Sequence, residues 1–280
     1  MARKHQAEIT IAAGLLLSAW LAGAAAVGQE RPTAAAPPAM PAPFSRDCQV
    51  PNDAVIRESP LPNVAAALQK RKEIKILAIG ASATAGRRGS YTDQIEQILE
   101  QAVKGLNVVT INRGVSGELA ADAVQRIKIE VALNQPDLVL WQVGTNDALA
   151  YVPIDELRDT IVEIVRWLRD HKVDVVLVGL QFVHRAAQDN NYRTVRELIR
   201  NIGEQEKVVL VRRSEAMRLI RQASESGGLF PQEFAQTEAG YACLAEYVSR
   251  AISLGAFGRG LRDQRPGAGQ PPGPPVPPPR

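Results

Sequence analysis

The stretch LVLWQVGTND at residues 138–147 is a largely apolar run that ends in a short polar turn. A near-continuous apolar run of this length is typical of a strand buried on both faces in a parallel sheet. The turn places the side-chain amide of Asn146 just beyond the end of that strand. Because ligands of open α/β sheets bind at the carboxyl ends of the strands, we expect Asn146 to lie at a ligand-binding edge.

Two earlier segments end in the same way, with small and polar residues after an apolar run. Residues 73–80 (EIKILAIG) lead into Ala81 and Ser82, and residues 106–112 (LNVVTIN) lead into the turn GVSG at 114–117. A serine, a glycine and an asparagine at neighbouring strand ends supply what acyl transfer needs, namely a nucleophile and several donors for an oxyanion. The pattern therefore predicts an acyl-transfer site.

Strand-like and helix-like segments alternate along most of the chain. Strands are expected at 74–79, 107–111, 138–143, 173–180 and 208–211, and helices at 91–104, 118–133, 154–170, 192–205 and 238–252. The clearest helix is 154–170, whose apolar residues recur at helical spacing. Repeated βα units with right-handed crossovers form a doubly wound domain. We predict a three-layer α/β/α fold with a parallel sheet of about five strands.

These segments resemble the SGNH (GDSL-like) hydrolases over residues 74–252, a family recognised by four sequence blocks. The first block corresponds to Gly80-Ala81-Ser82, the second to residues 112–117 and the third to residues 144–147. The resemblance implies a flavodoxin-like fold in which Ser82 is the nucleophile. It also implies that the backbone N–H of Gly117 and the side chain of Asn146 form the oxyanion hole.

The fourth block of the family departs from the pattern in this chain. Family members carry Asp-x-x-His a few residues before a Gly-Tyr pair, and that pair is present as Gly240 and Tyr241. The positions expected for the aspartate and the histidine hold Gln232 and Ala235. Since a serine hydroxyl is a poor nucleophile without an adjacent base, the resemblance predicts an ester hydrolase fold with impaired catalysis.

Histidines that could replace the missing base are few. Of the 3 histidines, His5 lies in the basic N-terminal segment and His171 ends a helix at the opposite edge of the sheet. His184 follows the strand at 173–180 on the same edge as Ser82, so it is either a replacement base or an exposed loop residue. Asp147 and Asp189 are carboxylates that could orient such a base, although an aspartate in a turn more often accepts backbone N–H groups.

The sequence is compatible with three functions. The protein is an ester hydrolase acting on O-acyl esters of a glycan or a small molecule, or a non-catalytic protein that binds a glycan or an envelope component in the former active site. The third possibility is an active esterase that uses His184 as its base. We expect the ligand to be an acylated glycan or a small ester in each case.

Composition argues against several other classes of function. The net charge is +3, the basic residues are dispersed, and only 5% of residues are aromatic, so no electrostatic footprint for nucleic acid is present. No His/Asp/Glu cluster has the spacing of metal ligands, and no phosphate-binding glycine loop occurs. We expect no cofactor, no metal and no nucleic-acid partner, and a monomeric protein.

The two ends of the chain differ in composition from the rest. Residues 1–28 combine a basic start with an apolar segment and small residues near Ala25, which predicts a secretory signal peptide and a periplasmic or secreted protein. The apolar segment is also about long enough for a membrane anchor. Residues 29–48 read as an Ala/Pro-rich linker, 49–258 as the hydrolase-like domain, and 259–280 as a disordered Pro/Gly-rich tail. No stable membrane insertion is expected once the signal is cleaved.

The chain has 2 cysteines, Cys48 and Cys243, near opposite ends of the predicted domain. In an exported protein such a pair is usually oxidised, so we expect a disulfide between them. Two buried unpaired thiols are the alternative.

Overall fold

The computed structural model describes residues 44–81, 84, 91–183, 186, 188–225, 234 and 237–262. The predicted signal peptide and most of the predicted linker and tail lie outside these residues. Among the described residues, none of the helices has the length and apolar character needed to cross a membrane.

The core of the domain is a six-stranded sheet with the order β1-β6-β5-β4-β2-β3. Its strands are β1 (Ile56–Arg57), β2 (Glu73–Gly80), β3 (Asn107–Gly114), β4 (Leu138–Gln142), β5 (Asp174–Val178) and β6 (Val209–Val211). All pairs are parallel except that β1 runs antiparallel to β6. The five parallel strands are those expected from the sequence, whereas β1 was not, because two residues are too few to show a strand pattern.

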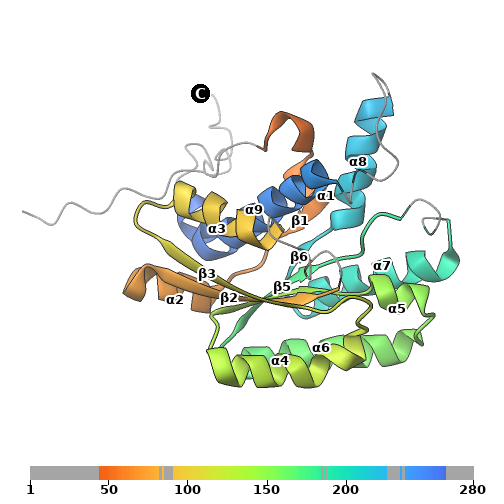
Figure 1. Cartoon of the computed structure of the whole chain (residues 1–280), viewed down its shortest axis with the longest axis horizontal. Coiled ribbons are helices and arrows are strands. Elements are labelled where there is room, and N and C mark those ends of the chain that lie inside the picture. Colours follow the sequence, from red (N-terminus) through yellow and green to blue (C-terminus); the bar gives the residue numbers. More distant parts are fainter. Residues whose placement is uncertain are drawn as a thin grey trace, which may run out of the picture. The chain divides into compact units, whose positions relative to one another are not determined.

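Helices cover both faces of this sheet (Figure 1). They are η1 (Arg46–Cys48), α1 (Asn52–Val55), α2 (Pro62–Arg71), α3 (Tyr91–Ala102), α4 (Ala120–Asn134), α5 (Thr145–Leu149), α6 (Ile154–Asp170), α7 (Asn190–Gln205), α8 (Arg213–Glu225) and α9 (Glu238–Arg262). Apolar residues of α2, α3, α8 and α9 pack on one face, and those of α4, α6 and α7 pack on the other. The predicted α/β/α layering is confirmed.

Helix α6 has the bounds that the sequence predicts, because its apolar residues form one stripe that is fully buried. The helices that the sequence did not predict are α1, α2, α5 and α8. Two of them, α1 and α5, are single turns, and short helices owe their stability to tertiary packing rather than to a periodic sequence signal. Helix α9 continues to Arg262 instead of ending near Ile252.

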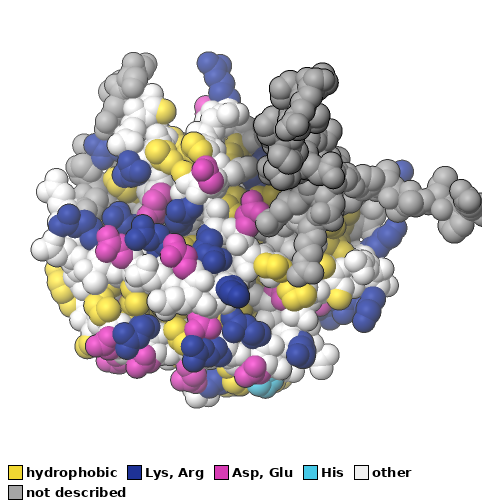
Figure 2. Space-filling model, turned by 180° about the vertical axis from the view of Figure 1, so that it is seen from behind, with side chains coloured by type: hydrophobic (Ala, Val, Ile, Leu, Met, Phe, Trp, Pro, Cys, Tyr) yellow, Lys and Arg dark blue, Asp and Glu magenta, His cyan; other side chains and the backbone are white. Residues whose placement is uncertain are grey.

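The surface of the domain carries charges of both signs. On the face shown in Figure 2, Lys and Arg side chains are interspersed with Asp and Glu side chains. Elsewhere in the described residues, oppositely charged side chains also pair, such as Arg166 with Glu206 at 2.6 Å and Lys128 with Glu163 at 2.9 Å.

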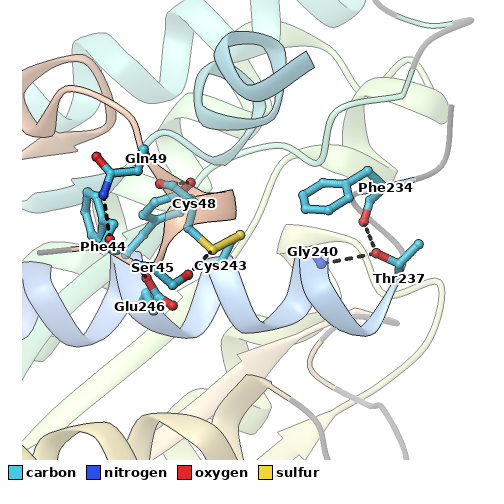
Figure 3. Close-up of a disulfide and its surroundings, with 10 residues drawn as sticks. Phe44, Ser45, Cys48, Gln49, Phe234, Thr237, Gly240, Cys243 and Glu246 are labelled. Atoms are coloured by element: carbon cyan, nitrogen blue, oxygen red, sulfur yellow. Dashed lines mark hydrogen bonds between the residues drawn. A yellow bond between two sulfur atoms is a disulfide. The ribbon is translucent and has the colours of Figure 1, made fainter. Parts of the chain in front are cut away.

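The segment around η1 is fastened to α9 by a disulfide between Cys48 and Cys243 (Figure 3). Next to the disulfide, the Phe44 ring meets the Tyr247 ring edge to face with centroids 4.9 Å apart. The Tyr247 hydroxyl donates to the backbone oxygen of Cys48 at 2.9 Å. Phe44 and Cys48 are buried, so the packed domain includes the last residues of the segment predicted to be a linker.

Loss of the disulfide should destabilise the domain. Because Cys48 and Cys243 are 195 residues apart, the bond removes much loop-closure entropy from the unfolded chain. We expect the double variant Cys48→Ser/Cys243→Ser to lose about 2–5 kcal/mol of unfolding free energy in urea titrations. Thiol titration of the denatured, unreduced protein should find no free thiol, and detection of two thiols would contradict the bond.

Candidate active site

Three strand ends meet at one small pocket on the carboxyl edge of the sheet. Its lining comes from the end of β2 (Gly80 and Ala81), the turn after β3 (residues 118–120) and the end of β4 with the start of α5 (residues 141–147). The pocket has a volume of about 10 Å³, which is room for one water-sized group. The described ends of β2 and β4 and the residues just before α4 therefore meet at this pocket, and Asn146 is among its lining residues, whereas Gly117 is not.

Gly144 allows the chain to turn sharply from β4 into α5. Its φ of +98° lies in a region that side-chain-bearing residues rarely adopt. A Cβ at this position would lie 2.3 Å from Cδ1 of Ile199 on α7 and 2.9 Å from Cδ1 of Leu180. This sharp bend at Gly144 places Asn146 at the start of α5, where it lines the pocket.

The side chain of Asn146 is aimed by the neighbouring turn. Its Nδ2 donates to the backbone oxygen of Glu118 at 2.8 Å, and an amide nitrogen has a second hydrogen to offer. Gly117, the residue before Glu118, has a φ of +81° and is exposed. These two predicted oxyanion donors therefore belong to turns that are joined by a direct hydrogen bond.

Asp147 also joins these two turns, through hydrogen bonds to both. Its carboxylate accepts the backbone N–H of Ala120 at 2.8 Å and that of Gly144 at 3.2 Å. Burial raises the pKa of Asp147, while these backbone N–H donors act in the opposite direction. Asp147 thus accepts backbone groups, as turn aspartates usually do, and does not face a histidine among the described residues.

The Glu118 side chain is held by an arginine from α4. Arg126 Nε donates to Glu118 Oε1 at 2.9 Å, and Arg126 Nη2 contacts Glu118 Oε2. The exposed fractions of the Glu118 and Arg126 side chains are 7% and 24%. Glu118 and Asp147 are the ionisable residues among the described lining of the pocket, and both carboxylates are engaged.

The turn that carries the predicted nucleophile is anchored at both ends by described residues. The backbone oxygen of Gly80 accepts the N–H of Val115 at 2.8 Å. At the other end, Asn112 Nδ2 donates to the backbone oxygen of Thr84 at 2.5 Å, and the Thr84 hydroxyl lies 3.3 Å from the Tyr91 hydroxyl. Ser82 itself lies outside the described residues, so its distance to Asn146 stays a prediction.

The two residues at the acid and base positions of the fourth block, and the histidine that could replace the base, also lie outside the described part of the chain. They are His184, Gln232 and Ala235. Just before α9, Thr237 accepts the N–H of Gly240 at 3.2 Å with its Oγ1 and caps the start of the helix (Figure 3).

His171 and Asp189 have structural roles away from the pocket. His171 follows α6 at the edge from which β5 starts, and its ring stacks on Trp167 at 3.9 Å between centroids. Asp189 caps α7 by accepting the N–H of Tyr192 at 3.0 Å, and it also accepts the Tyr151 hydroxyl at 2.7 Å.

Sequence reasoning missed Glu118, Arg126 and a buried arginine, Arg213, at the start of α8. Arg213 is completely buried, and the centre of its guanidinium lies 5.9 Å from the Tyr241 ring. Burial lowers the pKa of Arg213, and nearby tyrosines oppose that shift. Its position just after β6 is the same strand-end signal that pointed to Asn146, and it could have been found in that way. The described residues contain no cluster of His, Cys, Asp and Glu able to hold a metal ion.

Comparison with known proteins places this arrangement in a family. Residues 47–257 match the non-GDSL lipase-like family. The chain belongs to that family. It is also 26% identical over 109 residues to an arylesterase of Vibrio mimicus, a match that covers 38% of this chain and about half of the relative (54%).

Solved structures with the same fold share low sequence identity with this chain. They include a variant of the acetylxylan esterase Axe2 of Geobacillus stearothermophilus (23% identity, TM-score 0.53, 64% of this chain and 94% of that chain). A second is TesA, with 20% identity and a TM-score of 0.53 over 64% of this chain and 97% of that chain. A third is LAE5, an α/β hydrolase from the metagenome of Lake Arreo, with 20% identity and a TM-score of 0.56 over 65% of this chain and 96% of that chain. Axe2 variants at a serine, an aspartate and a histidine are described as catalytic mutants. The resemblance to SGNH-type hydrolases is confirmed, and this family member is esterase-like by homology.

The turn at Gly144 offers a test of the packing that supports the pocket. We expect Gly144→Ala to lower the unfolding free energy by about 2–4 kcal/mol, because the variant combines backbone strain with overpacking against α7. Gly105→Ala is the matched control, since Gly105 has a φ of +77° but nothing within 4 Å of its would-be Cβ. The control should lose only about 1–2 kcal/mol. Equal losses in urea titrations would show that contact with α7 is unimportant.

Proposed function

We propose that this protein is an exported, monomeric member of the family that binds O-acyl esters at the strand ends, with the acyl carbonyl oxygen at the small pocket, but hydrolyses them poorly. The ligand is an acylated glycan or a small ester. One observation supports the proposal: the hydrogen bond from Asn146 Nδ2 to the Glu118 backbone oxygen joins the turns that carry the two predicted oxyanion donors. Gly117 and Asn146 sit on joined turns, but the positions for the aspartate and histidine hold Gln232 and Ala235.

No substitute for the base is found in the described part of the pocket. Its carboxylates, Glu118 and Asp147, are bound to Arg126 and to backbone N–H groups respectively. The oxygens of both carboxylates are thus occupied by hydrogen bonds within the protein, and a general base must have a free oxygen within hydrogen-bond reach of the serine hydroxyl. The catalytic mutants of Axe2 at an aspartate and a histidine support the view that such residues matter for hydrolysis on this fold.

Export rests on the N-terminal residues and on the disulfide. Residues 1–28 have the composition of a signal peptide, and a disulfide such as Cys48–Cys243 persists in oxidising compartments. These features support a periplasmic or secreted location. Recovery of the protein from the cytoplasm with an intact N-terminus and two free thiols would oppose it.

The wild-type protein should hydrolyse 4-nitrophenyl acetate barely above background. We expect Ser82→Ala to change that rate by less than about twofold, because triad members act as a unit and the serine loses most of its advantage without a base. The measurement is steady-state release of 4-nitrophenolate, with covalent labelling by an organophosphonate as a second probe of serine activation. If the wild type hydrolyses the ester rapidly and His184→Ala abolishes that activity, then His184 is the base and catalysis is not impaired.

Restoring the missing pair should restore activity. We expect Gln232→Asp/Ala235→His to raise the rate by about 10²-fold or more, which is a typical contribution of general acid–base catalysis. The two single variants and the triple variant with Ser82→Ala are the controls. The singles should gain less, and the triple variant should return to the wild-type rate. A gain that survives Ser82→Ala would mean that the serine is not the nucleophile.

A further inference from the structure

One side chain from α4, that of Arg126, contacts both ends of the turn between β3 and α4. The guanidinium of Arg126 contacts both carboxylate oxygens of Glu118, with Nε to Oε1 at 2.9 Å, and its Nη1 contacts the backbone oxygen of Arg113. Arg113 and Glu118 flank the turn 114–117, which includes Gly117. One rigid fork therefore spans both ends of the turn, a geometry that guanidinium is suited to hold and ammonium is not.

Glu118 passes this constraint on to the second donor. Its backbone oxygen accepts Asn146 Nδ2 at 2.8 Å. The direction of that oxygen is set by the backbone around Glu118, and the bidentate contact with Arg126 fixes the side chain of the same residue. The aim of the Asn146 amide thus depends on a chain of contacts that begins at Arg126.

We propose that Arg126 is a positioning residue that aligns Gly117 and Asn146 as oxyanion donors by clamping Glu118 and Arg113. The proposal rests on the proposed function of the pocket as an acyl-ester site. Arg126 does not line the pocket, so it acts through Glu118 and not on a ligand. Small misplacements matter here, because oxyanion donors work only when they lie at about 3 Å from the developing charge.

The ion pair between Arg126 and Glu118 is more buried than an ordinary surface ion pair. The Arg126–Glu118 side chains are 24% and 7% exposed, whereas Lys128 and Glu163, which link α4 to α6, are 26% and 60% exposed. Removing one partner of a largely buried pair leaves the other charge uncompensated, and the Glu118 side chain should then move. Lys128 lies two positions further along the same helix and has a similar exposed fraction, so Lys128→Gln is a matched control.

The first experiment observes the donors directly in the oxidised full-length protein. With ¹⁵N-labelled Asn and Gly, the Asn146 side-chain signals are assigned by their loss in Asn146→Asp. We expect Arg126→Gln to shift the Asn146 Nδ2 and Gly117 N–H signals and to speed their exchange with water by about tenfold, whereas Lys128→Gln leaves both within about twofold of wild type. Unchanged signals in Arg126→Gln would overturn the proposal.

Arg126→Lys distinguishes a clamp from a general charge effect and serves if Arg126→Gln folds poorly. Lysine keeps the positive charge but cannot span Glu118 and the Arg113 oxygen, so we expect the same altered signals. If the Asn146 and Gly117 signals of Arg126→Lys match those of the wild type, the proposed clamp is contradicted. Signals of α9 residues such as Gly255, which lies on the other face of the sheet, report whether each variant is folded.

A second experiment measures the consequence for catalysis in the Gln232→Asp/Ala235→His background. There we expect Arg126→Gln to lower kcat by about 10–100-fold while KM stays within about twofold, because misaimed donors affect the transition state more than the bound ester. An unchanged kcat would overturn the catalytic role of the clamp. If the restored background is inactive, the proposed function fails, and the signals of Gly117 and Asn146 still decide the clamp.

Discussion

The parallel register of β2 with its two neighbours is the constraint on which the candidate site depends. Gly80 at the end of β2 lies opposite Gly114 of β3, and Ile79 lies opposite Trp141 of β4. Because the three strands run in the same direction and end at the same level, the turns that follow them converge on one pocket. A slip by one residue in either ladder would turn every side chain of that strand to the other face, and the pocket would lose its lining.

Above this frame, the turns are joined to one another rather than only to the sheet. Asp147 connects the starts of α4 and α5, and Arg126 connects both ends of the turn that contains Gly117. Buried carboxylates and backbone groups are costly unless they are hydrogen-bonded, so these contacts satisfy the polar groups and fix the donors at the same time. None of them involves the segment that carries Gln232 and Ala235. The positions of Gly117 and Asn146 are therefore set by contacts within these turns.

Local sequence patterns predicted most of the fold. The apolar strands and the amphipathic helix α6 were found because burial on two faces and burial on one stripe leave different periods in the sequence. Strand β1 and helices α1 and α5 were missed because they are too short to carry a period. The continuation of α9 beyond Ile252 was missed because the segment 253–262 has no clear apolar stripe, and the start of that continuation is held by contacts such as Leu61 with Gly255.

For the site, the order of residues along the chain predicts that Ser82, Gly117 and Asn146 follow three strands, and it shows Gln232 and Ala235 where the family pattern has an acid and a base. It could do so because a strand end and its turn are adjacent in the chain. How the turns hold one another is visible only in the folded chain, in contacts between residues such as Arg126 and Arg113 that are 13 positions apart. Such contacts leave no local pattern, because they depend on where a helix returns to the sheet and not on the residues beside it in the sequence.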